Sequence, residues 1–239
     1  MTLSQQPWMR SSRGGLRRAL RIAVCAILIF ILLPYVLTPL YLVVTPVSTP
    51  MLWRYLTGQP VTRIYRSLDE IAPVLPRTVI GSEDSRFCAH RGVDWRGLKD
   101  LLREADDLED LRGGSTITQQ TAKNLFLWSG RSYVRKALEL PLSLWMDFVL
   151  GKRRVMEIYL NVAEWGPNGQ FGAEAGSRRA FDKPARELTG HEAALMAAML
   201  PNPRRRDAKK PGPTVRRLAG IYQRRANTAG LADCLKLRR

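Results

Sequence analysis

Apolar residues form one long uninterrupted run near the start of the chain. Residues 22–44 carry no charged side chain, and these 23 residues are enough for a helix to cross a hydrocarbon core of about 30 Å. We therefore expect one transmembrane helix over residues 19–44, where Pro34 and Pro39 can be accommodated. A cleaved signal peptide usually has an apolar stretch of only about 7–15 residues. A buried core helix is the other alternative, but five arginines in residues 10–21 precede the run and place the N-terminus in the cytoplasm.

The pattern after this run is mostly helical. Residues 45–64 contain three prolines around a short apolar stretch at 51–56, and we expect them to form a juxtamembrane connector. Beyond them, apolar residues recur at helical spacing and strand-like alternation is scarce, which predicts a mainly α body. The helices we expect lie at residues 95–111, 116–127, 131–162, 172–181 and 189–200, with a further one near 214–229.

Two local signals predict where helices begin or end. Thr189 is followed three residues later by Glu192, which is the spacing of a capping box at a helix N-terminus. Pro141 lies within the longest expected helix, where it removes the hydrogen bond to the carbonyl of Ala137. We therefore expect that helix to end or kink just after residue 139.

Charge is concentrated at the two ends of the chain. The 38 Lys and Arg against 21 Asp and Glu give a net charge of +17, with +5 in residues 1–21, +2 in residues 45–203 and +10 in residues 204–239. A nearly neutral body argues against a nucleic-acid coat protein, and 45% apolar residues exclude a wholly disordered chain. We expect the basic C-terminal segment either to rest on anionic lipid or to be a solvated tail.

The cysteines offer little for metal binding. Cys25 lies in the apolar run, and Cys88 and Cys234 are far apart in the remainder. Because no C-x-x-C pair occurs, neither a zinc cluster nor a dense disulfide framework is expected. A bridge between Cys88 and Cys234 is the one pairing left, and the sequence does not favour it.

The first polar cluster that could carry chemistry covers residues 83–94. It opens with the adjacent carboxylates Glu83 and Asp84 and continues with Phe87, His90 and Asp94. Such a cluster could be a catalytic edge or a metal site. A solvated turn is the simplest interpretation of an isolated Glu-Asp pair.

The second cluster, residues 113–124, starts with two glycines. Ser115 or Thr116 can cap a helix there, and the free N–H groups of a helix N-terminus favour an anion. Gln120 and Lys123 share one face of that helix. We interpret the segment as a phosphate or sugar site, with an ordinary glycine-rich helix start as the equal alternative. The spacing is not that of a P-loop.

The third cluster places Arg135, Lys136 and Glu139 on one helical face. The simpler alternative is a surface ion pair, which contributes less than about 1 kcal/mol. Residues 152–161 alternate polar and apolar positions at helical spacing, which is typical of a packed amphipathic helix.

The order of these clusters resembles one known family. The segments that carry the resemblance are EDSRFCAHRGVD at 83–94, GGSTITQQTAKNLFL at 113–127, RKALE at 135–139, KRRVMEIYLNVAEWG at 152–166, FGAEAGSRRAFDKP at 171–184 and LTGHEAALMAAMLPNP at 188–203. Together they are similar to the family-51 glycosyltransferases, the peptidoglycan glycosyltransferases. No S-x-x-K or K-T-G occurs, so the resemblance is to the monofunctional members, which have no transpeptidase activity. The chain departs from the family pattern at Gly151, a position that is commonly serine.

The resemblance implies a lysozyme-like, mainly α glycosyltransferase domain at residues 65–203, with residues 1–18 as a cytoplasmic tail and 204–239 as a basic C-terminal extension. The implied reaction polymerises lipid II, a disaccharide-peptide on polyprenyl pyrophosphate, into β-1,4 glycan strands for the cell wall. It inverts the sugar carbon and releases polyprenyl pyrophosphate. The domain would lie in the periplasm, held on the bacterial inner membrane by its single span. Expected partners are lipid II, the growing glycan strand, membrane lipid, and cell-wall synthesis or division proteins, with no nucleic acid.

The resemblance also assigns roles to the residues that match the family motifs. The general base and the second carboxylate would be Glu83 and Glu139, the latter orienting nearby cations or a divalent ion (Mg²⁺ or Mn²⁺) near the pyrophosphate. The side chains that neutralise the pyrophosphate would be Lys123, Arg135 and Lys136. Hydrogen bonds to sugar or phosphate oxygens would come from Ser115, Thr116, Gln120 and Asn124. The first loop of the substrate site would be shaped by Asp84, Phe87 and His90.

Two other functions fit part of the pattern. A glycan-cleaving enzyme, such as a lysozyme or a lytic transglycosylase, would also use a helical domain with two carboxylates. Hydrolysis, however, has no use for cations around a pyrophosphate. A membrane-anchored binding module would depend on the basic tail, so truncation at residue 203 would abolish its function and a change at Glu83 would not.

Overall fold

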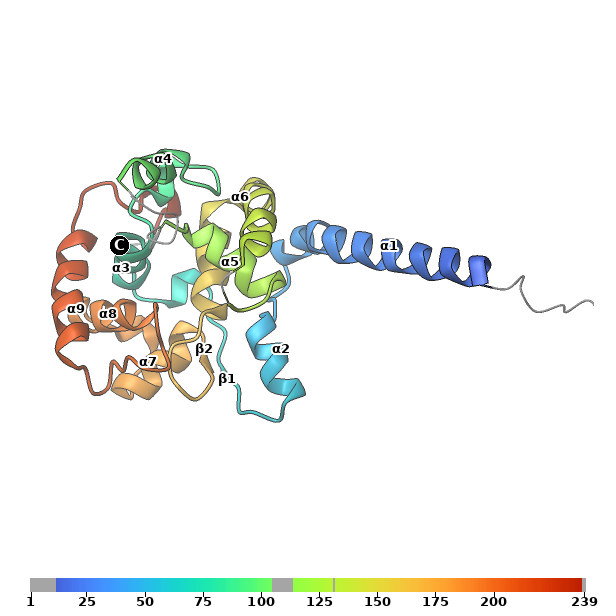
Figure 1. Ribbon diagram of the computed structural model, residues 1–239. Coiled ribbons are helices and arrows are strands. Elements are labelled where there is room, and N and C mark those ends of the chain that lie inside the picture. The colour runs from blue at the N-terminus through green and yellow to red at the C-terminus, as the bar shows by residue number, and fades with distance from the viewer. Residues whose placement is uncertain (1–11, 105–113, 131, 238–239) are drawn as a thin grey trace, which may run out of the picture.

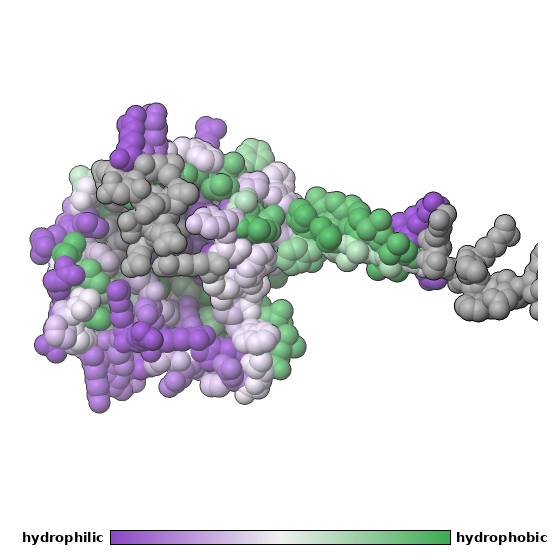
Figure 2. Space-filling view, in the orientation of Figure 1, coloured by the Kyte–Doolittle hydropathy of each residue, from purple (hydrophilic) through white to green (hydrophobic). Residues whose placement is uncertain are grey.

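The structure is a computed structural model that describes residues 12–104, 114–130 and 132–237. One long helix, α1 (Ser12–Leu37), projects from a helical body and is continued by the 3₁₀ turn η1 (Thr38–Leu42) (Figure 1). Residues Gly15–Leu42 are apolar enough and long enough to cross a membrane, and only 6% of their most apolar window is buried within the protein. Figure 2 shows this helix as a continuous apolar surface. Such exposure excludes a buried core helix and is consistent with a single-pass membrane anchor.

The body is mainly α, as expected. Its helices are α2 (Thr49–Leu56), α3 (Val74–Glu83), α4 (Trp95–Glu104), α5 (Ile117–Phe126), α6 (Tyr133–Val162), α7 (Ala173–Phe181), α8 (Gly190–Met199) and α9 (Pro213–Ala226). Short 3₁₀ turns are η2 (Leu68–Glu70), η3 (Phe87–Ala89), η5 (Ala185–Glu187) and η6 (Asp233–Leu235). The strands β1 (Thr62–Arg63) and β2 (Gln170–Phe171) form a parallel pair. The expected helix at 95–111 is seen as α4, and residues 105–111 lie outside the described part of the chain.

Side-chain caps begin the helices near the predicted positions. Thr189 accepts a hydrogen bond from the backbone of Glu192, and the Glu192 carboxylate accepts one from the backbone of Thr189, so the predicted capping box is confirmed. Thr116 and Gln119 form the same reciprocal arrangement at the start of α5. These caps satisfy backbone N–H groups that would otherwise lack partners.

The expectation that α6 ends or kinks just after residue 139 is wrong, because the helix continues through Pro141 and is interrupted only at Gly151. Residues on both sides of Pro141 are buried, including Glu139 and Leu142, so packing holds the helix together despite one missing hydrogen bond. The break comes instead at Gly151, whose φ of 69° and ψ of 165° are open almost only to glycine.

The body is built around α3, which packs against α8 and α9, while α5 packs against α6. Figure 1 shows α3, α8 and α9 grouped on the side of the body away from α1. Val215 and Ala219 of α9 are buried, and its arginines face outward. The expected division at residue 203 therefore falls inside the packed body. Most of the basic segment is a structural part of that body, because the apolar face of α9 covers α3 and α8.

The connector before the body is also docked onto it. Met51 of α2 is wholly buried, and Arg54 forms an ion pair of 2.7 Å with Glu164. The other side of α2 exposes Leu52, Trp53, Tyr55 and Leu56, and Figure 2 shows an apolar patch there. At the base of α1, Arg154 of α6 donates a hydrogen bond of 2.7 Å to the carbonyl of Tyr41. The anchor is thus attached to α6, and the connector to α5 and to the segment that follows α6.

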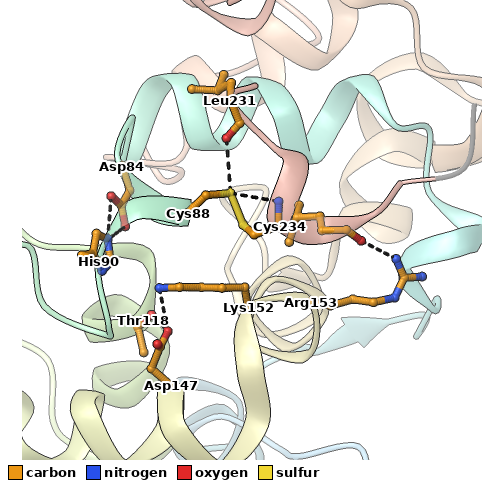
Figure 3. Close-up of a disulfide and its surroundings, with 10 residues drawn as sticks. Asp84, Cys88, His90, Thr118, Asp147, Lys152, Arg153, Leu231 and Cys234 are labelled. Atoms are coloured by element: carbon orange, nitrogen blue, oxygen red, sulfur yellow. Dashed lines mark hydrogen bonds and ion pairs between the residues drawn. A yellow bond between two sulfur atoms is a disulfide. The ribbon is translucent and has the colours of Figure 1, made fainter. Parts of the chain in front are cut away.

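A disulfide joins Cys88 to Cys234, although the sequence did not favour this pairing (Figure 3). The two Cα atoms are 5.5 Å apart, within the usual range for a bridge. The chain after α9 turns back so that η6 lies beside η3, and this long-range approach brings the two thiols together. Cys25 is free and exposed on α1.

Candidate active site

Glu83 is the last residue of α3, where the helix ends and the first polar cluster begins. Its carboxylate accepts a hydrogen bond of 3.0 Å from the side-chain nitrogen of Gln120 on α5. Burial raises the pKa of Glu83, against the lowering effects of the Gln120 hydrogen bond and of the positive charges of Arg206 and Lys123. A partly buried carboxylate with a raised pKa at the edge of a cleft is suited to exchange a proton.

The loop after Glu83 is held by Asp84, which Figure 3 shows pointing at His90. Both Asp84 oxygens lie 3.0 Å from Nε2 of His90, and one of them also accepts a hydrogen bond of 3.0 Å from the backbone N–H of Ile117. Phe87 is wholly buried and packs edge-on against His90. The contacts of Asp84, Phe87 and His90 therefore hold the first loop in shape, and their role in substrate binding stays a prediction.

Backbone N–H groups at the N-terminus of α5 have hydrogen-bond partners within the protein. Thr116 is only 3% exposed, caps the helix through Gln119, and donates a hydrogen bond of 2.6 Å to the carbonyl of Gly92. The first helical N–H, that of Ile117, is occupied by Asp84. Thr116 therefore serves as a helix cap, and one acceptor position of its hydroxyl is left over, so the expectation that it binds a phosphate or a sugar stays a prediction.

Gly92 explains why the first loop can lie so close to α6. Its φ is 78°, and a Cβ placed there would come within 2.4 Å of the carbonyl oxygen of Ser143. Only glycine combines that backbone conformation with that close approach. The loop, the start of α5 and the middle of α6 thus meet at a single point.

A cluster of positive charge lies on the adjoining part of α5 and α6. Lys136 contacts Oε2 of Glu139 at 3.3 Å and donates a hydrogen bond of 2.7 Å to the hydroxyl of Ser115. Arg135 forms an ion pair with the other oxygen of Glu139. Glu139 is only 2% exposed, so the alternative of a surface ion pair is excluded.

The three cations of this cluster outnumber its carboxylate. Burial, together with the positive charges of Arg135 and Lys123, lowers the pKa of Lys136 to about 8. The pKa of Lys123 is lowered by burial and by Arg135, while Glu83 acts to raise it. These mutual effects place the three cations and Glu83 in one electrostatic environment. The excess positive charge is well suited to bind an anion with more than one negative charge.

The accessible space beside these residues is an open cleft. Its lining includes Glu83, Arg86, Ser115 and, from α4, Leu98 and Leu101. Asn124 lies further along α5 with a half-buried side chain, and its backbone carbonyl accepts a hydrogen bond of 3.2 Å from Thr49. The cation group adjoins this cleft through contacts with its lining, because Lys136 bonds Ser115 and Gln120 bonds Glu83.

Two residues near Glu83 were missed from the sequence. Tyr159 of α6 is almost wholly buried, and its hydroxyl donates a hydrogen bond of 3.2 Å to the side-chain oxygen of Gln120. Arg206 follows α8, donates a hydrogen bond of 2.9 Å to the carbonyl of Ala198, and acts on Glu83 through its charge. Helical spacing indicated only packing for the first, and the second was counted with the basic tail.

The residues present do not fit a protein-held divalent cation. Glu139 is the carboxylate nearest the cation cluster, and both of its oxygens already contact Arg135 or Lys136. Across the described parts of the chain, no group of three or more His, Cys, Asp or Glu side chains could hold a metal ion. We therefore derive no step of the reaction through a metal.

The sequence of this chain is similar to those of known proteins over most of its length. The family model described as Transglycosylase matches residues 51–227, which includes α9 and the connector helix. The chain is 59% identical over 219 residues to the biosynthetic peptidoglycan transglycosylase of Nitrobacter winogradskyi, which covers 92% of this chain and 97% of that one. It is 58% identical over 223 residues to the protein of the same name from Rhodopseudomonas palustris, with 92% and 97% covered.

A third relative, the biosynthetic peptidoglycan transglycosylase of Rhizobium johnstonii, is 53% identical over 216 residues, which is 90% of this chain and 88% of that one. Residues 51–227, which the family model matches, contain α3, the first loop, α5 and α6. The similarity also confirms the expected lysozyme-like, mainly α fold. The chain therefore belongs to the transglycosylase family.

Proposed function

We propose that the protein is a peptidoglycan glycosyltransferase that polymerises lipid II into β-1,4 glycan strands and releases polyprenyl pyrophosphate. The observation that carries this proposal is the pairing of one carboxylate, Glu83, with an adjoining cluster of three cations that has a single buried carboxylate. That arrangement supplies a base for one reactant and a counter-charge for the other. The names of the relatives support peptidoglycan as the product.

In the proposed reaction the 4-hydroxyl of an acceptor sugar attacks C1 of the donor sugar. The new O–C1 bond forms as the bond from C1 to the pyrophosphate oxygen breaks, and its electron pair leaves with the pyrophosphate, so the configuration at C1 is inverted. The hydroxyl proton passes to Glu83, which must be ionised to accept it. A positioned base of this kind typically accelerates a reaction by about 10² to 10⁴. The raised pKa of Glu83 makes its carboxylate a stronger base than an exposed glutamate.

Pyrophosphate is a good leaving group, so it needs charge neutralisation more than a proton donor. Lys123, Arg135 and Lys136 provide it, and Glu139 holds the charges of Arg135 and Lys136 in place before the substrate arrives. With a pKa of about 8, Lys136 is mostly protonated at neutral pH, and a bound pyrophosphate would strengthen that protonation. Glu139 holds two of the cations at the correct spacing and is itself too buried to act as a second base.

The anchor fits a substrate that carries a lipid tail. A tethered enzyme meets such a substrate by diffusion within the membrane, and the exposed apolar face of α2 adjoins the base of the anchor. We infer that the body lies on the periplasmic side of the bacterial inner membrane, with the N-terminus in the cytoplasm. The Cys88–Cys234 disulfide supports this orientation, because such bridges persist in oxidising compartments such as the periplasm.

The test is the rate of lipid II polymerisation by the full chain and by Glu83→Gln, with lipid II binding measured in parallel. We expect a fall of at least about 10² in kcat with little change in binding. Near-normal polymerisation by Glu83→Gln would remove the base assignment. Finished glycan strands serve as the second substrate, and product from strands alone would favour a glycan-cleaving enzyme instead.

The cation cluster is tested by Lys123→Ala, with Lys210→Ala, an exposed lysine beyond α8, as the matched control. We expect the first variant to lower kcat more than it raises KM, because the charge on the leaving group grows in the transition state. The control should behave like the unchanged chain. An unchanged kcat in Lys123→Ala would assign that lysine to binding or packing.

A further inference from the structure

Tyr159 lies in the second part of α6, behind the residues that face the cleft. Its side chain is 1% exposed, so it does not touch a substrate. Its hydroxyl nevertheless contacts the oxygen of the Gln120 amide at 3.2 Å, and the nitrogen of the same amide lies 3.0 Å from Glu83. One buried phenol is thus connected to the base through a single side-chain amide.

We propose that Tyr159 is a positioning residue for the reaction: its hydroxyl fixes the Gln120 amide so that the amide nitrogen faces Glu83. This inference rests on the proposed role of Glu83 as the base. An amide can rotate by 180° and present either its oxygen or its nitrogen to a neighbour. An ionised carboxylate accepts hydrogen bonds only, so it is stabilised by the nitrogen and repelled by the oxygen. The Tyr159 hydroxyl selects the useful orientation by donating to the oxygen on the other side.

The chemistry of the phenol determines which group donates in each of the two hydrogen bonds that connect Tyr159, Gln120 and Glu83. A phenol donates its proton only while it is protonated, and Tyr159 remains so because burial and the negative charges of Glu83 and Asp84 raise its pKa well above the ordinary value. Tyr159 therefore donates to Gln120, and Gln120 donates to Glu83. The arrangement favours the ionised form of Glu83, which is the form that accepts a proton from the acceptor sugar.

Other charged or titratable groups also act on Glu83, and all of them remain when the Tyr159 hydroxyl is removed. They come from the first loop, from α5, from the segment after α8 and from α9, and are Asp84, Lys123, Arg206 and Tyr222. Because their contributions are common to both proteins, a comparison of Tyr159→Phe with the unchanged chain isolates the effect of one hydroxyl.

The experiment measures kcat for lipid II polymerisation by the full chain across pH, for the unchanged protein, Tyr159→Phe, Gln120→Ala and the double variant. In Tyr159→Phe the amide can turn its oxygen toward Glu83, which disfavours the ionised carboxylate. We expect the acidic limb of the profile to move to higher pH by about half to one unit. Tyr65→Phe is the matched control, because it also removes a phenol that bonds a carboxylate, that of Glu157, and its limb should stay in place.

The double variant separates positioning from general loosening of the fold. If Tyr159 acts through Gln120, its removal in the Gln120→Ala background should produce almost no further shift. An acidic limb that stays in place in Tyr159→Phe would overturn the proposal, as would a shift of equal size in the Gln120→Ala background. An unmoved limb in Gln120→Ala alone would do so even if Tyr159→Phe did not fold. Failure of the proposed function is seen separately, as near-normal polymerisation by Glu83→Gln.

Discussion

The disulfide between Cys88 and Cys234 should be a major source of stability. The two residues are 146 positions apart, and closing a loop of that length removes unfolded-state entropy equivalent to about 5 kcal/mol at 25 °C. Residual structure in the unfolded chain makes this an upper value, and native disulfides typically contribute about 2–5 kcal/mol. For a chain of this size each kcal/mol corresponds to about 2–4 °C. Removing the bridge should therefore lower the unfolding midpoint by roughly 10 °C.

The assay is thermal unfolding of the full chain in detergent, followed by circular dichroism, for Cys88→Ser with Cys234→Ser. Cys25→Ser is the matched control, because Cys25 is free and exposed on the anchor, and its midpoint should not move. A thiol reductant should lower the midpoint of the unchanged chain and leave that of the double variant where it is. A double variant that unfolds within about 2 °C of the unchanged chain would refute the entropic reasoning.

Three further predictions concern substitutions of single residues. Gly92→Ala should lower the free energy of unfolding by more than about 2 kcal/mol in chemical unfolding, because the new Cβ would lie 2.4 Å from the Ser143 carbonyl oxygen. Gly58→Ala is the control: Gly58 also has a positive φ but has open space around it, so the change should cost only about 1 kcal/mol. Equal costs for the two variants would contradict the close contact at Gly92. The value of kcat/KM should fall as pH rises through about 8, because Lys136 loses its proton there. Lys136→Arg should move this alkaline limb of the profile to higher pH. An alkaline limb that does not move would assign the proton loss to another group. Burial acts to raise the pKa of Glu174, but a backbone N–H and two arginines lower it overall, so its stabilising effect is present above about pH 4.5 and lost as pH falls further. Thermal midpoints of the unchanged chain and Glu174→Gln should therefore converge at low pH, and a constant difference would exclude this linkage.

Local signals predicted the helices and part of the site. The capping box at Thr189 depends on two residues three positions apart, so it can be recognised without the fold. The group of Arg135, Lys136 and Glu139 lies within one turn of a helix, and the structure keeps it together for the same reason. The expectation for Pro141 failed because packing on both sides of the helix outweighed one lost hydrogen bond.

Long-range contacts were out of reach of the same reasoning. The Cys88–Cys234 bridge depends on where the chain after α9 packs, and the approach of Arg206 to Glu83 on where the chain after α8 packs, and no local pattern reveals either. Thr116 shows a different difficulty. A hydroxyl at the start of a glycine-rich helix can cap the helix, bind a phosphate or do both, and only the fold shows that this one is buried and bonded to Gly92.

The packing of α3 against α8 and α9 also bears on how the protein is made. Synthesis delivers the anchor and Glu83 early, but the helices that enclose Glu83 only near the end. Until the late helices emerge, that carboxylate sits in an unfinished, hydrated segment, without the burial that raises its basicity. We therefore expect copies that end before α8 and α9 to reach the membrane through their first helix but to lack the enclosed surroundings of Glu83.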